Sequence, residues 1–332
     1  MNTLDKPVAV IILNWNGAKL LQQFLPSVIA NTDPNLARII IADNGSTDDS
    51  IKVLNEQFKD VDVFKFDQNY GFAGGYNKAI EMVDNKYVVL LNSDVETPER
   101  WLNPLYDFME THPHVGAVQP KILSYKDKTK FEHAGAAGGL IDINGFPYCR
   151  GRVFNSVETD YGQYDAAPSS IFWATGAAMF VRRDAYIKAG GLDNEFFAHM
   201  EEIDLCWRMQ LLGYRIFAVP ESKVYHLGGG SLEYKNPRKT YLNFRNNLLM
   251  MYKNLPDRTR SRKLFVRRLL DTLAWLMYVV KFDFKNAKAI FKAHRDFAKM
   301  KHNYTVHPEV DLLETMNPRC NILTEHYIFH NR

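Results

Sequence analysis

The sequence predicts an α/β protein with a mostly parallel central sheet flanked by helices, followed by a helical C-terminal extension. Two observations predict this class. Short β-branched apolar runs alternate with amphipathic segments through the first 120 residues, as they do in βαβ units. Polar residues also follow several of these runs directly, and α/β sheets bind their ligands beyond the carboxyl ends of the strands.

The order of elements follows from hydrophobic periodicity. Val8–Leu13 (VAVIIL) is a continuous apolar run, typical of a strand buried on both faces. We expect further strands at 38–42, 61–66, 87–91 and 116–119, and helices at 20–29, 48–58, 74–83 and 99–110. Residues 122–170 lack a clear period, which predicts an irregular excursion with short strands. Beyond it we expect a strand at 171–182, a helix at 201–212, a strand at 215–219, and helices at about 239–254, 261–282 and 285–300.

The composition is that of an ordinary globular protein, but the charge is unevenly distributed. The 332 residues are 46% hydrophobic and 24% charged, which excludes wholesale disorder, a coiled coil and a small disulfide-stapled scaffold. Residues 235–301 carry 18 Lys and Arg against 4 Asp, a net +14 that leaves −11 elsewhere in a chain of total charge +3. We predict a body over 1–235 and a basic helical region over 236–332 that meets anions.

Cysteine usage and apolar runs predict a cytoplasmic location. The three cysteines form no CxxC pair, and no signal peptide is evident at the N-terminus. The longest apolar run lies within 273–280, well short of the roughly 20 residues that span a bilayer. Two roles stay open for the basic helices: peripheral contact with the inner face of the cytoplasmic membrane, or packing on the body or in an oligomer. The aromatic residues that suit an interface are Trp275, Tyr278, Phe282, Phe284, Phe291 and Phe297.

The first two predicted strands end in polar turns. Asn14-Trp15-Asn16-Gly17 follows the first, and Asp43 ends the second before a Ser- and Asp-rich turn. Asp43 either accepts hydrogen bonds within its turn or receives a nucleobase N–H or ribose hydroxyl. The residues alone favour neither of these two roles for Asp43.

A glycine-rich segment and a carboxylate follow the next two strands. Asn69–Asn77 (NYGFAGGYN) reads as a loop entering a helix, where glycines let the backbone approach a ligand. It matches neither the dinucleotide-binding nor the P-loop fingerprint. Asp94 ends the run LLNSD, and a carboxylate there suits Mg²⁺ or Mn²⁺ bridging a diphosphate.

A later acidic cluster and a histidine add acid–base candidates. Glu201, Glu202 and Asp204 open a helix behind the pair Phe196-Phe197. A cap needs one or two of these acids, so one is available as a general base. His226 precedes a glycine run, which gives a phosphate or a metal ion room to approach.

Together these motifs resemble the family 2 glycosyltransferases of the GT-A (Rossmann-like) fold, and most closely a bacterial branch of rhamnosyltransferases. The likeness covers about 8–256 of the chain. Its pieces, in order, are ILNWNG, DNGSTDDS, NxGFAGGxN, LLNSD, TGAAMFVRRD, GGLDNEFFAHMEEIDLCWR, GYRI, VPESKVYHLGGGS and RNNLLMMYKNLP.

The resemblance implies an inverting, metal-dependent enzyme of the hexosyltransferase type. Its donor would be a nucleoside-diphosphate sugar, dTDP-rhamnose or a UDP-sugar. Its acceptor would be a hydroxyl of a glycan or lipid-linked saccharide in cell-surface polysaccharide synthesis. The residues implied for nucleotide binding are Asn14, Asn16, Asp43, Asn69, Gly74, Gly75, Asn92 and Arg245.

The resemblance also assigns the metal and catalytic positions. Asp94 and His226 would bind Mg²⁺ or Mn²⁺, with Asn92 where many relatives carry the first Asp of a DxD motif. Glu202 would be the base, supported or replaced by Asp204, with Glu201 beside it. The residues implied for the donor and acceptor pocket are Thr175, Gly176 and Phe197.

Two other functions compete with this one. A sugar nucleotidyltransferase shares the α/β base but opens with a basic glycine-rich loop, which Asn14–Ala18 does not resemble. A nucleic-acid-binding module would use the basic region, but it leaves the acid–histidine cluster unexplained, and a body of charge −11 repels phosphates. We therefore expect no nucleic-acid partner.

Overall fold

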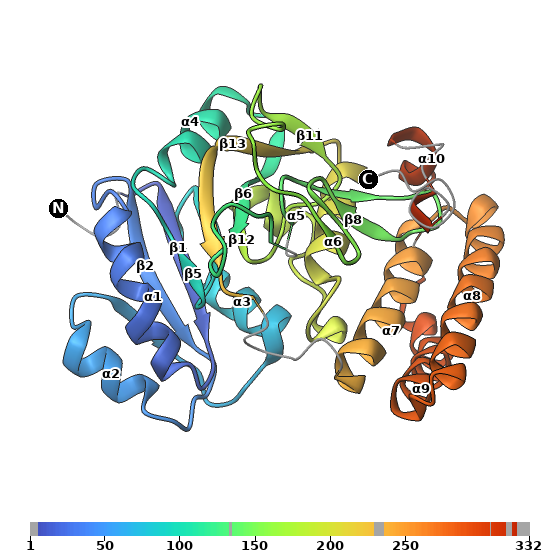
Figure 1. The fold of residues 1–332 in the computed structure, drawn as a ribbon. Coiled ribbons are helices and arrows are strands. Elements are labelled where there is room, and N and C mark those ends of the chain that lie inside the picture. The colour runs from blue at the N-terminus through green and yellow to red at the C-terminus, as the bar shows by residue number, and fades with distance from the viewer. Residues whose placement is uncertain (1–5, 133–134, 229–235, 306, 317–320, 324–332) are drawn as a thin grey trace.

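A computed structural model describes residues 6–132, 135–228, 236–305, 307–316 and 321–323. In this part of the chain a nine-stranded sheet forms the centre of the molecule (Figure 1). Its order is β11-β13-β6-β12-β4-β1-β2-β3, with β5 paired to β13. The strands are β1 (Val8–Asn14), β2 (Ala37–Asp43), β3 (Asp62–Lys65), β4 (Tyr87–Asn92), β5 (Val95–Glu96), β6 (Val115–Ser124), β11 (Ser169–Ile171), β12 (Ala178–Arg182) and β13 (Arg215–His226).

Parallel pairing builds both halves of the sheet. Strands β4, β1, β2 and β3 are parallel neighbours, as are β6 and β13. Strand β12 joins the halves and is antiparallel to both β4 and β6. The predicted α/β class is confirmed, and the carboxyl ends of β1, β2 and β4 share one edge.

Helices cover both faces of the sheet. They are α1 (Ala18–Asn31), α2 (Ser50–Gln57), α3 (Gly71–Glu81), α4 (Asn103–Thr111), α5 (Arg183–Lys188), α6 (Glu201–Leu211), α7 (Pro237–Asn254), α8 (Asp257–Val280), α9 (Phe284–Met300) and α10 (Leu312–Met316). Alternate residues of β1 enter two separate cores, because successive side chains of a strand point to opposite faces. Val10 packs with residues of α1, α2 and α4, whereas Ile11 packs with residues of α3, α6 and α7.

The irregular excursion predicted over 122–170 contains a small antiparallel sheet. Its order is β10-β9-β8-β7, from β7 (Gly139–Ile141), β8 (Pro147–Cys149), β9 (Arg152–Val153) and β10 (Ser156–Val157). Cys149 and Cys206 are buried, and Cys320 lies outside the described residues.

Several predicted elements differ from the observed ones. The strands predicted over 116–119 and 215–219 are longer, because β6 runs to Ser124 and β13 to His226. Helix α3 begins at Gly71 rather than Gly74, so Gly74 and Gly75 lie inside a helix and not in a loop. A Cβ at Gly75 would lie 2.6 Å from Leu13 Cδ1, so close helix–strand packing requires glycine there. The strand predicted over 171–182 is two strands, because a turn at Thr175 interrupts it and the Thr175 hydroxyl accepts a bond from the Ala177 N–H at 3.1 Å.

The C-terminal helices divide into an inner helix and an outer hairpin (Figure 1). Helix α7 contacts α6, and the hairpin of α8 and α9 packs on α7. Among the described residues, no helix has both the length and the apolar character to cross a membrane. The predicted division at residue 235 lies outside the described residues. Of the predicted interface aromatics, Phe297 is buried against Tyr252, which fits the alternative of packing on the body.

Candidate active site

Strand pairing brings Asp94 and His226 together. Strand β5 pairs with the end of β13, so that Val95 lies opposite His226 and the Leu227 N–H donates to the Asp94 carbonyl at 3.0 Å. Asp94 Oδ1 is 3.1 Å from His226 Nε2, and both residues are buried. Asn92 Nδ2 lies 3.4 Å from the same ring nitrogen. Three residues predicted near the donor diphosphate thus meet at one point.

Glu132 completes this cluster, and the sequence analysis missed it. Glu132 Oε2 is 3.0 Å from His226 Nδ1, on the ring edge opposite Asp94. A Cβ at Gly228, whose φ is +67°, would lie 2.6 Å from Glu132 Oε1. The first glycine of the run after His226 is therefore needed for this contact. Gly229, Gly230 and Ser231 lie outside the described residues.

The charges in this cluster fit a divalent cation. Burial lowers the pKa of His226, but the hydrogen bonds that its ring donates to Asp94 and Glu132 outweigh burial and raise it to about 10. A histidine held at one nitrogen by a carboxylate, with the other nitrogen beside a second carboxylate, is a common arrangement around bound metals. No closed set of three His, Cys, Asp or Glu ligands is found in the described part of the chain. Binding of a divalent cation by Asp94 and His226 stays a prediction.

Glu201 and Glu202 open helix α6 with buried carboxyl oxygens. One carboxyl oxygen of each has no hydrogen-bond partner among the described residues. Burial raises the pKa of Glu202 to about 7, and burial with the charge of Glu202 raises that of Glu201. A carboxyl group that titrates near neutral pH is suited to take up a proton from a hydroxyl.

Asp204 is held by cations and an amide. Its carboxylate accepts bonds from Arg208 at 2.9 Å, Lys253 at 3.0 Å and Asn254 at 2.7 Å. Burial would raise the pKa of Asp204, but Arg208 and Lys253 lower it overall. Its bonds to Lys253 and Asn254 join α6 to α7, which suits the supporting role among its two predicted roles.

A strained segment precedes Glu201 and Glu202. Phe197, His199 and Met200 have φ values of 63°, 70° and 73°, in a region that side chains other than glycine rarely adopt. The Asn246 amide on α7 donates to the carbonyls of Phe196, Ala198 and His199 at 3.0, 2.9 and 2.7 Å. These bonds hold the segment that leads into Glu201 and Glu202.

Arg245 supports the same segment. Its guanidinium donates to the carbonyls of Glu195 at 2.8 Å and Phe196 at 3.2 Å, and the residue is 8% exposed. Its predicted contact with a diphosphate stays a prediction.

The pocket residues adjoin this segment. A Cβ at Gly176 would lie 3.0 Å from the Phe72 ring and 3.8 Å from Glu202 Cβ, so the turn after Thr175 passes between the two. The Phe197 carbonyl accepts a bond from the Phe72 N–H at 2.8 Å. Gly176 and Phe197 thus both lie against Phe72 in the first turn of α3, and their place in a donor and acceptor pocket stays a prediction.

The ends of β1 and β2 form a buried polar cluster. Asn14 Nδ2 donates to Asp43 Oδ2 at 2.9 Å, and the Ser46 N–H donates to Asp43 Oδ1 at 3.0 Å. Asn14 Oδ1 is buried and has no hydrogen-bond partner among the described residues. The turn bonds that were one reading of Asp43 are present. Nucleobase binding by Asp43 stays a prediction.

Asn69 belongs to a second polar cluster beside α3. The Asn69 side chain accepts bonds from Asn44 at 3.1 Å and from the Gly71 N–H at 2.8 Å. A Cβ at Gly75 would lie 3.1 Å from the Asn44 amide, whereas one at Gly74 would approach Tyr70. The side chain of Asn69 thus fixes the entry into α3.

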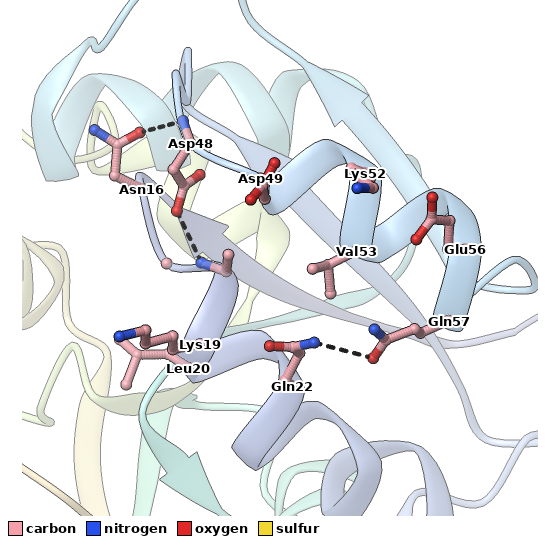
Figure 2. Close-up of a pocket in the computed structure, with 12 residues that line it drawn as sticks. Asn16, Lys19, Leu20, Gln22, Asp48, Asp49, Lys52, Val53, Glu56 and Gln57 are labelled. Atoms are coloured by element: carbon pink, nitrogen blue, oxygen red, sulfur yellow. Dashed lines mark hydrogen bonds between the residues drawn. The ribbon is translucent and has the colours of Figure 1, made fainter.

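Asn16 lies at the edge of a groove between α1 and α2 (Figure 2). The side-chain oxygen Oδ1 of Asn16 accepts bonds from the N–H groups of Thr47 at 2.7 Å and Asp48 at 3.3 Å, which tie the two strand-end turns together. Of the predicted site residues, Asn16 alone lines this groove. Asp94, His226 and Glu202 are not among the residues that line it.

The fold is an α/β domain with a mostly parallel sheet, and comparison with known proteins gives its family. Residues 9–190 match the model of glycosyl transferase family 2, more than half of the chain, and the chain belongs to this family. It is 26% identical over 232 residues to N-acetylglucosaminyl-diphospho-decaprenol L-rhamnosyltransferase of Mycobacterium tuberculosis, covering 65% of this chain and 75% of that protein. It is 24% identical over 233 residues to rhamnosyltransferase WbbL of Escherichia coli K12, covering 66% and 83%.

Solved glycosyltransferases share the fold at low sequence identity. S. aureus TarS 1-349 in complex with UDP-GlcNAc has a TM-score of 0.58 at 16% identity, over 87% of this chain and 80% of that one. GalNAc-T7 with UDP, GalNAc and Mn²⁺ has a TM-score of 0.59 at 17% identity, over 76% of this chain and 48% of that one. The chain is thus a family 2 glycosyltransferase with a GT-A fold, like the rhamnosyltransferase branch.

Proposed function

We propose that the enzyme transfers a sugar, with inversion, from a nucleoside-diphosphate sugar to a saccharide hydroxyl. The donor would be dTDP-rhamnose or a UDP-sugar, and the acceptor a glycan or lipid-linked saccharide of a cell-surface polysaccharide. The observation that carries the proposal is the close approach of Asp94 to His226 at 3.1 Å, and the buried Glu202 on α6 supplies a general-base candidate. The named activities of the rhamnosyltransferase relatives support it.

Asp94 and His226 would hold the divalent cation, Mg²⁺ or Mn²⁺. When bound, the cation neutralises the charge that develops on the leaving diphosphate. The imidazole of His226 would present Nε2, because Glu132 engages Nδ1 at 3.0 Å and sets the ring orientation. Glu132 is thus a positioning residue in the proposal. Mn²⁺ in complexes of the structural neighbours is consistent with this assignment.

Glu202 would act as the general base. It takes the proton of the acceptor hydroxyl as that oxygen forms a bond to the anomeric carbon and the bond from that carbon to the diphosphate oxygen breaks. One displacement from the opposite face inverts the configuration. Glu201 would favour proton uptake through its nearby carboxylate, and Asp204 would fix the helix through Arg208 and Lys253.

The remaining predicted residues would form the nucleotide and sugar pockets. Asn14 and Asp43 would face the base, with Asn16 and Asn69 holding the turns around it. The pocket for the donor sugar and acceptor would lie at Gly176 and Phe197, next to Glu202. Gly74 and Gly75 would contribute through the packing of α3 rather than through an open loop.

The proposal also includes a cytoplasmic location with peripheral contact to the membrane. The basic residues of 236–301 support it, because the cytoplasmic leaflet is anionic. This contact is separable from the transfer reaction, since the residues proposed for catalysis lie on the sheet edge and on α6.

A donor panel tests the proposed function. Purified enzyme is incubated with dTDP-rhamnose, UDP-sugars and GDP-sugars in the presence of Mg²⁺, Mn²⁺ or a chelator, and release of nucleoside diphosphate is measured. We expect metal-dependent release from one donor, and Asp94→Ala to abolish the metal dependence. The matched control is Asp49→Ala, an exposed Asp at the start of α2. Release that persists with chelator, or from no donor at all, contradicts the proposal.

A further inference from the structure

Helix α8 presents its apolar residues outward and buries charged ones. Its buried residues are Lys263, Leu264, Arg267 and Asp271. Its exposed large apolar residues, with fractional exposures from 37% to 74%, are Phe265, Val266, Leu269, Leu273, Leu276, Met277 and Val280. A helix on the surface of a soluble body has the opposite arrangement.

Buried ion pairs fix this orientation. Arg267 Nε donates to Asp271 Oδ1 at 2.8 Å, and His294 of α9 contacts the other oxygen of Asp271 at 3.1 Å. Lys263 Nζ lies 3.3 Å from Asp311 Oδ2. Turning the apolar residues inward would place these charges in solvent and break the pairs. The helix is therefore held with its apolar stripe facing out.

The exposed residues form one continuous stripe. Phe265, Leu269, Leu273, Leu276 and Val280 recur at intervals of three or four residues, which places them on one side of the helix over about 22 Å. At the turn into α9, Phe282 and Phe284 are 81% and 60% exposed, with ring centroids 6.2 Å apart. Phe282 has a φ of 57°, an unfavourable conformation for an aromatic residue. The turn thus extends the apolar stripe.

Exposed cations lie on both helices. Within residues 257–300, all of which the structure describes, nine Lys and Arg are exposed against one acidic residue, Asp257. They are Arg258, Arg262, Arg268, Lys281, Lys285, Lys288, Lys292, Arg295 and Lys299. We call the exposed side of both helices, with the turn between them, the α8–α9 face.

We propose that the α8–α9 face docks on an anionic lipid bilayer, with both helices lying in the plane of the interface. The apolar stripe and the aromatic turn would enter the boundary between headgroups and acyl chains, while the cations contact lipid phosphates. Apolar patches of this kind on a soluble body mark an interaction site.

The charges favour a bilayer over a second copy of the chain. Two copies joined through this face would bring their cations together, and like charges at an interface are unfavourable. An anionic bilayer instead supplies apolar depth and negative charge at the same surface. The proposal does not depend on the transfer reaction, because docking needs neither donor nor acceptor.

Vesicle flotation tests the proposal with the full-length enzyme. One set of vesicles is phosphatidylcholine alone, and the other contains equal parts of phosphatidylcholine and phosphatidylglycerol. We expect binding to the second set only, decreasing as salt is raised. Leu273→Ser should weaken binding about tenfold, and replacing Lys285, Lys288 and Lys292 with Gln should weaken it by about fivefold per lysine.

Matched controls separate the face from general surface effects. Ile187→Ser changes an exposed apolar residue on α5, and Lys52→Gln with Lys59→Gln changes exposed lysines near α2. These should bind like the parent enzyme. Unchanged binding by the α8–α9 variants, or equal binding to both vesicle sets, would overturn the proposal. So would light scattering that shows a dimer which Leu273→Ser converts to a monomer without loss of vesicle binding.

Discussion

Helices α7 and α8 follow one another in the basic C-terminal region, yet they are built in opposite ways. Helix α7 buries Arg245, Asn246 and Asn254, and all three bond to α6 or to the segment before it. Helix α8 buries Lys263, Arg267 and Asp271 in ion pairs with one another, with α9 and with Asp311, and exposes its apolar side. A shared net charge therefore says little about what each helix does.

The comparison divides the C-terminal region by function. Changes on α7 should disturb catalysis through the strained segment that leads into Glu202. Changes on the outside of α8 should leave catalysis alone. This division predicts the largest effect at Glu202, the proposed base, and a smaller effect on turnover at Asn246 of α7.

We expect the largest loss of turnover when Glu202, the proposed base, is replaced. Glu202→Gln keeps the shape of the side chain but removes its ability to accept a proton, so turnover should fall by about 10²–10⁴-fold. Donor affinity, measured by calorimetry, should stay close to that of the parent. The neighbouring change Glu201→Gln should cost less. Equal turnover of parent and Glu202→Gln would move the base to another residue, with Asp204 the next to test.

Replacing Asn246, which bonds to the segment before α6, should have an intermediate effect on turnover. Asn246→Ala deletes three bonds to carbonyls between 196 and 199, so kcat should fall by roughly 10–100-fold. KM for the donor should change little, because the Asp43 cluster is untouched. The matched control is Asn247→Ala, also buried on α7 but bonded to the Gly145 carbonyl and to Arg267. It should lose about 1–3 kcal/mol of stability without the same fall in kcat per folded enzyme.

The pH dependence of turnover gives a finer measure of the segment. Burial raises the pKa of Glu202 to about 7, so turnover should rise with pH through about 7 as the base loses its proton. In Asn246→Ala, a loosened segment admits water, and the rise should move toward the ordinary range of a glutamate. A pH profile that is identical in both enzymes would show that α7 does not shape the environment of Glu202.

The same burial affects stability in a predictable direction. Glu202 binds its proton more tightly in the folded enzyme than in the unfolded chain. The free energy of unfolding therefore falls as pH rises through about 7, because the folded enzyme must then hold a buried charge. Glu202→Gln removes this cost and should raise the free energy of unfolding by about 2 kcal/mol at pH 8, with little change at pH 5. Denaturant unfolding at the two pH values measures it. A destabilised Glu202→Gln at pH 8 would contradict burial of an ionising carboxyl group.

The sequence predicted the sheet edge better than the contacts on it. Asn14, Asp43 and Asp94 each come just after a predicted strand of the alternating strand–helix region. Their shared edge could therefore be inferred from strand–helix alternation alone. The 3.1 Å approach of Asp94 to His226 depends on pairing between β5 and the end of β13, residues far apart in the chain. Local periodicity carries no information about such pairing.

Glu132 and the orientation of α8 show where sequence reasoning stops. Glu132 lies in an irregular stretch whose pattern predicts no contact with His226. The one hint in the sequence is Gly228, because a side chain at that position would collide with Glu132. The apolar stripe of α8 is visible in the sequence, but its period does not tell which side faces the body. Buried pairs with α9 and Asp311 decide that, and they form only in the folded chain.

One paired measurement tests the division of the C-terminal region most directly. Asn246→Ala and Leu273→Ser are each assayed for donor turnover without lipid and for flotation with anionic vesicles. The account predicts that Asn246→Ala loses roughly 10–100-fold in turnover and keeps vesicle binding, while Leu273→Ser keeps turnover within about twofold and loses vesicle binding. Loss of both properties in either variant, or of neither in both, would contradict it.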